Sequence, residues 1–119
     1  MNAATQQALR QDRVIDITTT GRKSGEPRRI EIWFHNVDDR LFITGLPGKR
    51  SWYANLLATP AFTFHLKESV SADIPARAVP ILDESERRRI LGPITNNLDR
   101  VADLDQWLES SPLVEVLLE

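Results

Sequence analysis

The strongest constraint on the fold comes from short segments in which apolar and polar residues alternate. The clearest is Arg29–Val37, RIEIWFHNV, where Ile30, Ile32 and Phe34 fall on one face. A period of two predicts a strand with one buried face. Turn formers bound this segment on both sides, GRKSGEP before it and Asp38-Asp39 after it. With strands over Val14–Thr19 and Leu41–Thr44, the first half predicts a three-stranded antiparallel meander.

The second half predicts further strands separated by helices. Strands are expected over Ala61–Leu66 and Leu113–Leu118, with an extended Ser71–Leu82 whose Pro75 and Pro80 indicate an edge or a bulge. Helices are expected over residues 2–11, from an N-cap at Ser51 to Pro60, from a capping box at Asp83 and Glu86, and over Asp103–Glu109. Gly92-Pro93 is expected to break or kink the third helix. The pattern is α+β, with six mostly antiparallel strands closing into a small barrel.

Composition excludes several kinds of site. The 119 residues form a single domain, 1–119, with residues 1–12 as a short helix or arm. Without cysteine there is no disulfide or thiolate chemistry, and two histidines do not make a multi-histidine metal site. His35 and His65 are expected to be partly exposed structural residues, and no Ser–His–acid arrangement is predicted. No signal peptide or membrane span is evident, so a cytoplasmic location is expected.

The charge distribution indicates a local anion site. Residues 1–50 carry a formal charge of +3 and residues 51–119 one of −5, within a net charge of −2. A nucleic-acid binder is usually basic overall, so no nucleic-acid partner is expected. The loop TTTGRKSGEPRR places Arg22, Lys23, Arg28 and Arg29 around two glycines, which suits phosphate or carboxylate oxygens. A solvated basic turn is the alternative interpretation of this loop.

Two more basic residues precede the predicted helix SWYANLLA. Lys49 and Arg50 stand before its first turn, where free N–H groups favour an anion. If the first turn and this helix start are neighbours, six cations converge. Asn55 is the only polar side chain in mid-helix, and Trp52 and Tyr53 supply either core packing or an aromatic wall for a flat ring.

These motifs in this order, TTTGRKSGEPR, a meander and then WYANLLATP, resemble the deazaflavin-dependent nitroreductase family. The resemblance extends from about Ile15 to the last strand. It implies a split β-barrel and hydride transfer from coenzyme F420, whose ribityl phosphate and oligoglutamate tail need a cationic cradle. Tyr53 is a weak candidate proton donor. The resemblance also implies cofactor-binding roles for Arg22, Lys23, Ser24, Arg28, Arg29, Ile30, Ile32, Thr44, Gly45, Leu46, Lys49, Arg50, Ser51, Trp52 and Asn55.

The sequence departs from the family pattern at two places. Pro47 stands where family members often carry a loop lysine, so Lys49 or Arg50 is expected to replace it. The tyrosines that precede the last strand in nitroimidazole-reducing members are absent, and Trp107 stands in that region. Nitroimidazole reduction is therefore not carried over. The expected partner is a small-molecule hydride acceptor: a quinone, an enone or another conjugated compound, with a nitroaromatic as the remaining class.

Three alternatives stay open at this point. An FMN-binding or heme-binding split barrel shares the fold; FMN, which has a phosphate but no oligoglutamate, needs fewer cations than this loop offers. A non-enzymatic carrier of a cofactor or lipid predicts tight binding without turnover. A homodimer across the sheet is possible, with Trp33 and Val37 as interface residues.

Overall fold

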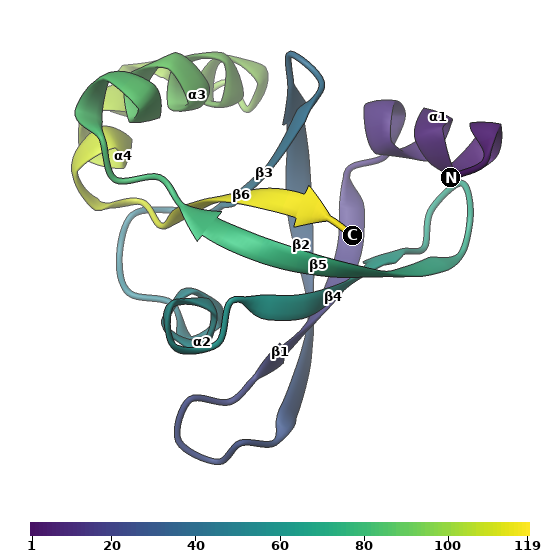
Figure 1. Cartoon of the computed structure of the whole chain (residues 1–119). Coiled ribbons are helices and arrows are strands. Elements are labelled where there is room, and N and C mark those ends of the chain that lie inside the picture. The colour runs from purple at the N-terminus through teal and green to yellow at the C-terminus, as the bar shows by residue number, and fades with distance from the viewer.

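The computed structural model describes residues 1–119 as one closed, fully antiparallel six-stranded barrel (Figure 1). Its strands follow one another around the barrel in the order β1-β2-β3-β6-β5-β4. The elements along the chain are α1 Ala3–Gln11, β1 Val14–Thr20, β2 Pro27–Val37, β3 Arg40–Thr44, α2 Ser51–Ala58, β4 Ala61–Leu66, β5 Ala72–Pro80, α3 Glu84–Asn97, a 3-10 turn Val101–Asp103, α4 Leu104–Ser110 and β6 Leu113–Leu118. The predicted fold class, the meander and all six strands are confirmed.

The register of the meander explains why alternation predicted it correctly. Ile15 lies opposite Ile32, so both point into the barrel, while their neighbours Asp16 and Glu31 share the outer face. Phe34 continues the inner row and is buried. The buried row stabilises the sheet because each inward side chain removes apolar area from water.

Two apolar clusters hold the helices in place. The barrel interior includes Ala8 of α1 and Trp52 and Leu56 of α2, and these two helices lie at opposite ends of the barrel (Figure 1). The second cluster covers the outer face of β3 and β6, where Phe42 and Leu113 pack beneath α3 and α4. Helix α2 is thus fixed against one mouth of the barrel.

The structure corrects two expectations about prolines: β5 has neither an edge position nor a bulge, and α3 has no break. Strand β5 is not at an edge, because it pairs with both β4 and β6. Pro75 is tolerated because its carbonyl accepts from Glu119 at the very end of β6, so its missing N–H falls where that ladder stops. Helix α3 also runs unbroken through Gly92 and Pro93. Pro93 and Arg89, whose carbonyl it leaves free, are both exposed, so water can satisfy that carbonyl.

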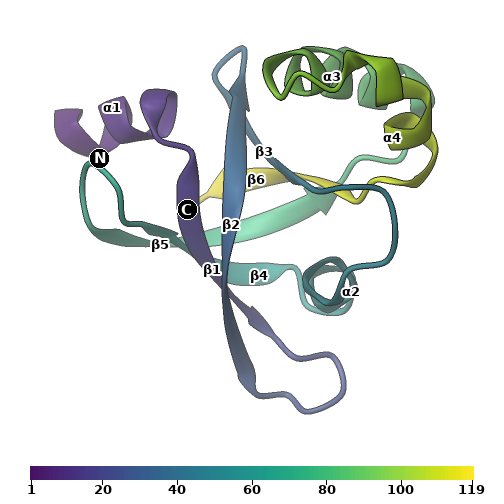
Figure 2. The same ribbon diagram turned by 180° about the vertical axis from the view of Figure 1, so that it is seen from behind.

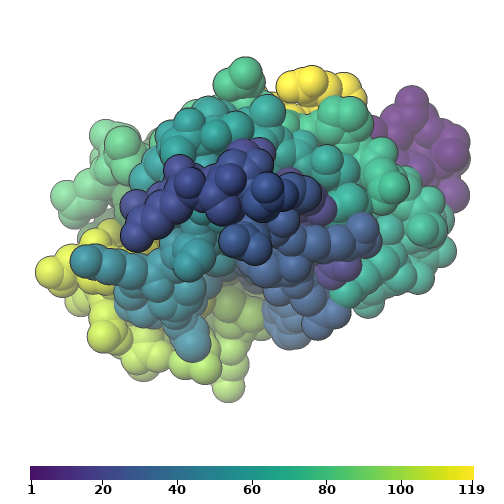
Figure 3. All heavy atoms as spheres, turned by 90° about the horizontal axis from the view of Figure 1, so that it is seen from below, coloured from purple at the N-terminus to yellow at the C-terminus, as the bar shows by residue number.

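The turn between β1 and β2 extends beyond the barrel on the side where α2 lies, and the view from behind shows the same arrangement (Figures 1 and 2). Figure 3 looks at this end of the molecule, where the dark blue hairpin crosses the surface beside the teal α2 region. None of the helices combines the length and apolar character required to cross a membrane.

Candidate functional site

A cleft of about 460 Å³ lies between the β1–β2 hairpin and the start of α2. We call it the basic cleft. The residues that line it are Thr19, Gly21, Arg22, Lys23, Ser24, Arg28, Ile30, Ser51, Trp52 and Asn55. Most of these were predicted from sequence to bind the cofactor. The hairpin and the tryptophan helix, about 30 residues apart in the chain, therefore share one site.

The hairpin turn is shaped by its two glycines. Gly25 has a φ of +71°, a conformation that glycine adopts without strain. A Cβ on Gly21 would lie 2.6 Å from the Ser24 hydroxyl oxygen and 3.3 Å from the Glu26 carbonyl oxygen, so a larger residue here would displace the Ser24 side chain. The Gly21 N–H donates to the Glu26 carbonyl at 2.8 Å. The Ser24 hydroxyl accepts from the Glu26 N–H at 3.1 Å, so this side chain also helps to shape the turn.

Asn55 joins the helix to the hairpin. Its Oδ1 accepts the backbone N–H of Arg22 at 3.0 Å, and its Nδ2 donates to Thr19 Oγ1 at 3.1 Å. The residue is buried, and both ends of its amide are used. Sequence reasoning singled out Asn55 as a polar residue in mid-helix, and the structure shows that it positions the hairpin.

The cleft is cationic without acidic compensation. Arg22, Lys23 and Arg28 line it, no carboxylate does, and none of the three forms an ion pair within 4.0 Å. The structure also corrects the helix cap. Arg50, not Ser51, is the N-cap of α2, and its side chain makes no capping hydrogen bond. The first-turn N–H groups of α2 consequently lack a capping side chain, which favours a nearby anion.

The expected convergence of six cations is wrong for three of them. Arg29 follows Arg28 on the strand and so points to the opposite face, where it pairs with Asp16 at 2.9 Å. Arg50 folds back onto its own loop and donates to the carbonyls of Lys49 and Leu46. Lys49 lines a different cavity.

The other predicted cofactor residues lie outside the basic cleft. Ile32 packs against the barrel core, and Thr44 is buried with its hydroxyl donating to the Pro112 carbonyl at 2.6 Å. Gly45 and Leu46 belong to the loop between β3 and α2, and Leu46 is about half exposed. They line neither the basic cleft nor the cavity that Lys49 lines.

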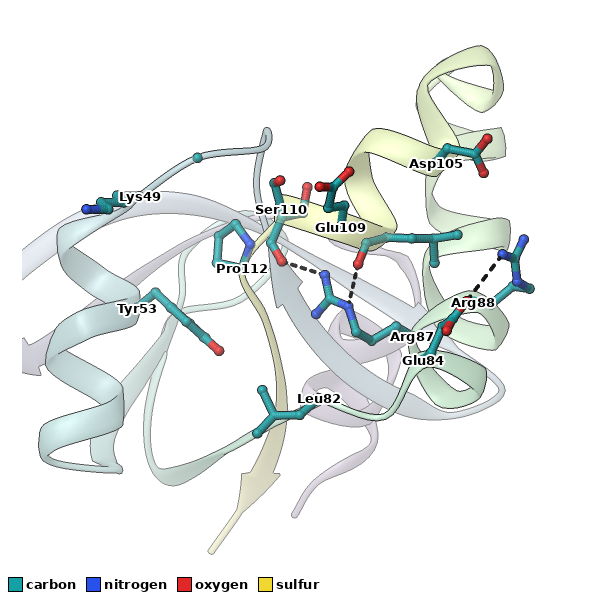
Figure 4. Close-up of a pocket in the computed structure, with 13 residues that line it drawn as sticks. Lys49, Tyr53, Leu82, Glu84, Arg87, Arg88, Asp105, Glu109, Ser110 and Pro112 are labelled. Atoms are coloured by element: carbon teal, nitrogen blue, oxygen red, sulfur yellow. Dashed lines mark hydrogen bonds and ion pairs between the residues drawn. The ribbon is translucent and has the colours of Figure 1, made fainter.

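A second cavity, of about 880 Å³, lies on the other side of the α2 start (Figure 4). We call it the α2–α4 cavity. It is lined by Gly48, Lys49, Tyr53, Leu82, Glu84, Arg87, Arg88, Asp105, Leu108, Glu109, Ser110, Ser111 and Pro112. Its cations and carboxylates are equal in number, so it lacks the single-sign charge of the basic cleft. Trp52 faces one cavity and its neighbour Tyr53 the other.

Sequence analysis assigned no site residue to α3 or α4 and so missed their contribution to this cavity. Among the charged residues of α3, Arg87 is the buried one, with only 8% of the residue exposed. The sequence did contain a signal for this. Arg87 stands three and four residues before the buried Ile90 and Leu91, so it shares their helix face.

Arg87 is held by backbone carbonyls instead of a carboxylate. Its Nε donates to Leu108 at 3.0 Å, its Nη2 to Trp107 at 3.0 Å and to Ser111 at 2.7 Å, and its Nη1 to Ile81 at 3.0 Å. Burial lowers the pKa of the guanidinium from its ordinary value. Because the bonds to Trp107 and Leu108 satisfy the last carbonyls of α4, Arg87 also fixes the end of that helix.

His65 departs from two expectations. It is buried, not partly exposed, and lies between Thr18 Oγ1 and Asp73 Oδ1, each 2.7 Å from a ring nitrogen. The hydrogen bond from His65 lowers the pKa of Asp73. A Thr–His–Asp arrangement thus exists that sequence analysis did not predict. It lies on the outer face of the sheet and lines neither cavity, so we assign it to strand cohesion.

Comparison with known proteins places this geometry in a family. The family model described as F420H(2)-dependent quinone reductase matches residues 1–118. Among solved structures, an F420-H2 dependent reductase named FDR-A superposes with a TM-score of 0.61 at 17% identity, covering 89% of this chain and 95% of that one. A FAD-binding protein from Mesorhizobium loti gives 0.69 at 17% identity, covering 100% and 91%. The heme storage protein HutZ from Vibrio cholerae gives 0.73 at 17% identity, covering 98% and 89%. At these identities the structural matches establish the split-barrel fold alone.

Proposed function

We propose that the chain, which belongs to the F420H(2)-dependent quinone reductase family, holds coenzyme F420 by its tail in the basic cleft and reduces a conjugated acceptor. The observation that carries this proposal is the cleft itself. Three cations line it with no carboxylate among them. The family membership makes the chain an oxidoreductase that uses F420, and the acceptor and the hydride-transfer step are the proposed parts.

The residues of the basic cleft fit the anionic part of F420. Arg22, Lys23 and Arg28 are exposed and form no ion pair. The guanidinium groups of the two arginines can donate two parallel N–H bonds, and the ammonium group of Lys23 supplies a compact charge, to phosphate and carboxylate oxygens. The uncapped first turn of α2 adds backbone N–H groups, beginning at Ser51. FMN carries only the phosphate, so the number of free cations favours the longer polyanion.

The α2–α4 cavity is the proposed place for the acceptor. It adjoins the basic cleft around the start of α2, because Lys49 and Tyr53 line one while Ser51 and Trp52 line the other. Lys49 belongs to the loop in which the family lysine was expected, so it remains the proposed substitute. Arg50 is less suited, since its guanidinium is bound to loop carbonyls.

When bound, reduced F420 supplies a hydride, and the chain supplies position and protons. A conjugated acceptor that takes up a hydride is left with an electron pair on its oxygen, and one proton then completes the reduced product. The Tyr53 side chain extends into the α2–α4 cavity (Figure 4) and forms no hydrogen bond within the protein. Tyr53 therefore stays the proposed donor, with solvent as the second source of the proton.

Heme binding has less support. An axial ligand is needed, and the chain has only two histidines. His65 has both ring nitrogens engaged, and neither histidine lines the basic cleft or the α2–α4 cavity. No specific observation favours a carrier without turnover. A protein that only binds the cofactor tail does not need the additional space of the α2–α4 cavity.

The direct test mixes the chain with reduced F420 and menadione and follows the deazaflavin absorbance. We expect the oxidised cofactor to appear in proportion to menadione consumed. A chain that binds reduced F420 but leaves its absorbance unchanged is a carrier, and the reductase proposal then fails. Parallel titrations with FMN and heme test the alternative ligands.

A further inference from the structure

Arg87 carries a buried positive charge with no neighbouring carboxylate at the wall of the α2–α4 cavity. No ion pair within 4.0 Å involves it, and all four of its hydrogen bonds go to neutral carbonyls. Figure 4 shows the Arg87 side chain pointing from α3 towards Pro112, with dashed lines from its guanidinium to backbone carbonyls. A guanidinium has five N–H donors, so one remains free of a protein partner.

The neighbouring arginine shows what an ordinary charge at this cavity looks like. Arg88 also lines the cavity, but its side chain is 56% exposed and pairs with Glu84 at 3.9 Å. Water and Glu84 both reduce its effect on a ligand. The carboxylates of the lining, Glu84, Asp105 and Glu109, belong to exposed residues. Arg87 is thus the one cation of the lining that is shielded from water.

Anchoring the end of α4 accounts for three N–H groups of Arg87 and the Ile81 carbonyl for a fourth, but these bonds leave the charge unexplained. Burying a guanidinium without a counter-charge is costly, and neutral side chains can also bind carbonyls. A fixed, desolvated cation is the arrangement that stabilises negative charge as it develops on an oxygen. Such charge develops on a carbonyl oxygen when its conjugated system accepts a hydride.

Building on the proposed function, we propose that Arg87 binds the carbonyl oxygen of the acceptor and stabilises the oxyanion that hydride transfer leaves there. A hydride brings two electrons to the acceptor, the pair shifts to the oxygen facing Arg87, and a proton then neutralises it. The cavity therefore selects quinones and enones, and it holds anionic quinones more tightly than neutral ones.

Binding of two naphthoquinones, measured by calorimetry in the absence of cofactor, tests this inference. Lawsone is an anion at neutral pH, whereas menadione has a similar size and no charge. A desolvated charge-assisted contact predicts that the chain prefers lawsone by roughly tenfold to a hundredfold. Arg87→Gln should abolish the preference, and Arg87→Lys should retain part of it. Arg88→Gln is the matched control, because it removes the same charge from the exposed lip, and it should keep the preference.

Circular dichroism shows which variants fold. If Arg87→Gln does not fold, Arg87→Lys and the wild-type chain still decide the question. Equal affinity of the wild-type chain for the two compounds, or a preference lost in Arg88→Gln, overturns the inference. The outcome is separable from the proposed function. If the chain prefers lawsone but does not oxidise reduced F420, the reductase activity is rejected and the anion site is kept. If the chain oxidises reduced F420 without preferring lawsone, the reductase activity is kept and the anion site is rejected.

Discussion

Asn55 accepts the backbone N–H of Arg22 through its side-chain oxygen at 3.0 Å, and this bond ties α2 to the basic hairpin. The same amide donates to Thr19, so one buried side chain holds the end of β1 and the start of the hairpin turn against the helix. The position of the cations therefore depends on a residue that carries no charge.

Replacing Asn55 separates this structural role from the charge of the cleft. Asn55→Ala should lower the free energy of unfolding by about 1–3 kcal/mol, because the buried Thr19 hydroxyl and the part-buried Arg22 N–H both lose a hydrogen bond. Asn55→Asp keeps an acceptor for both the Arg22 N–H and the Thr19 hydroxyl but places a negative charge in the cleft. We expect it to be nearer the wild type in stability and to bind F420 more weakly than Leu57→Ala, an exposed control on the same helix. Equal F420 affinity in the Asp variant and the control would contradict this.

His35 should make stability depend on pH. Burial, with a smaller contribution from the Arg13 charge, lowers its pKa from 6.5 to about 4. Because the folded-state pKa is the lower one, the unfolded chain binds more protons between these values, and stability falls as pH drops from 6.5 towards 4. The slope can reach about 1.4 kcal/mol per pH unit.

Urea denaturation at several pH values measures this effect. The His35→Gln variant should lose the slope between pH 6.5 and 4. The carboxylates of Asp16, Asp73 and Glu68 also have lowered pKa values, but their stabilising effect is lost as pH falls through and below their ordinary pKa values of 3.8 and 4.5, so the slope between pH 6.5 and about 5 reports on His35. An unchanged slope in the variant means that His35 is not the group responsible.

Removing the hydroxyl groups of two buried residues should have different effects on the free energy of unfolding. Ser111 Oγ is buried and has no hydrogen-bond partner, so Ser111→Ala should leave stability unchanged or raise it. Thr44 donates to the Pro112 carbonyl at 2.6 Å, and Thr44→Val should cost about 1–3 kcal/mol by leaving that carbonyl unpaired. Thermal and urea denaturation of both variants provide the comparison. A loss of stability in Ser111→Ala as large as that in Thr44→Val would show an unrecorded role for the serine.

Features that depend on neighbouring residues in the chain were predicted better from the sequence than features that depend on distant residues. Alternation is local, so the strands were predicted to within a few residues. The Asp83 N-cap was confirmed, because its side chain accepts the Glu86 N–H at 3.0 Å, but the Glu86 side chain pairs with Arg40 and Arg89 instead of completing the capping box. The convergence of Arg22 with Ser51 depends on barrel closure and needed the family resemblance. The spacing of Arg87 to Ile90 and Leu91 indicated its burial, but its carbonyl partners could not be predicted, because they lie up to 24 residues along the chain.

Side-chain direction marks the other limit. The motif implied similar roles for Arg28 and Arg29, although strand geometry alone separates adjacent side chains. Arg28 lines the basic cleft, while Arg29 pairs with Asp16 on the outer face. The cofactor roles of the residues in the cleft, the acceptor and a homodimer through Trp33 remain predictions.

The binding of F420 to the basic cleft is the central claim, and calorimetric titration tests it most directly. The wild-type chain is compared with Arg22→Ala/Lys23→Ala and with a matched double variant, Arg10→Ala/Arg77→Ala, which removes two unpaired cations outside the cleft. Each is titrated with F420, and with the same deazaflavin lacking phosphate and glutamates, at about 50 mM and about 500 mM salt, where screening lengths differ several-fold.

We expect wild-type and control chains to bind F420 more tightly than the truncated deazaflavin and to lose most of that advantage at high salt. The Arg22→Ala/Lys23→Ala chain should lose most of this advantage and of its salt dependence, keeping only the part that Arg28 and the first turn of α2 provide. If that variant retains the wild-type affinity for F420 and its salt dependence, the tail does not lie in the basic cleft, and the account is wrong.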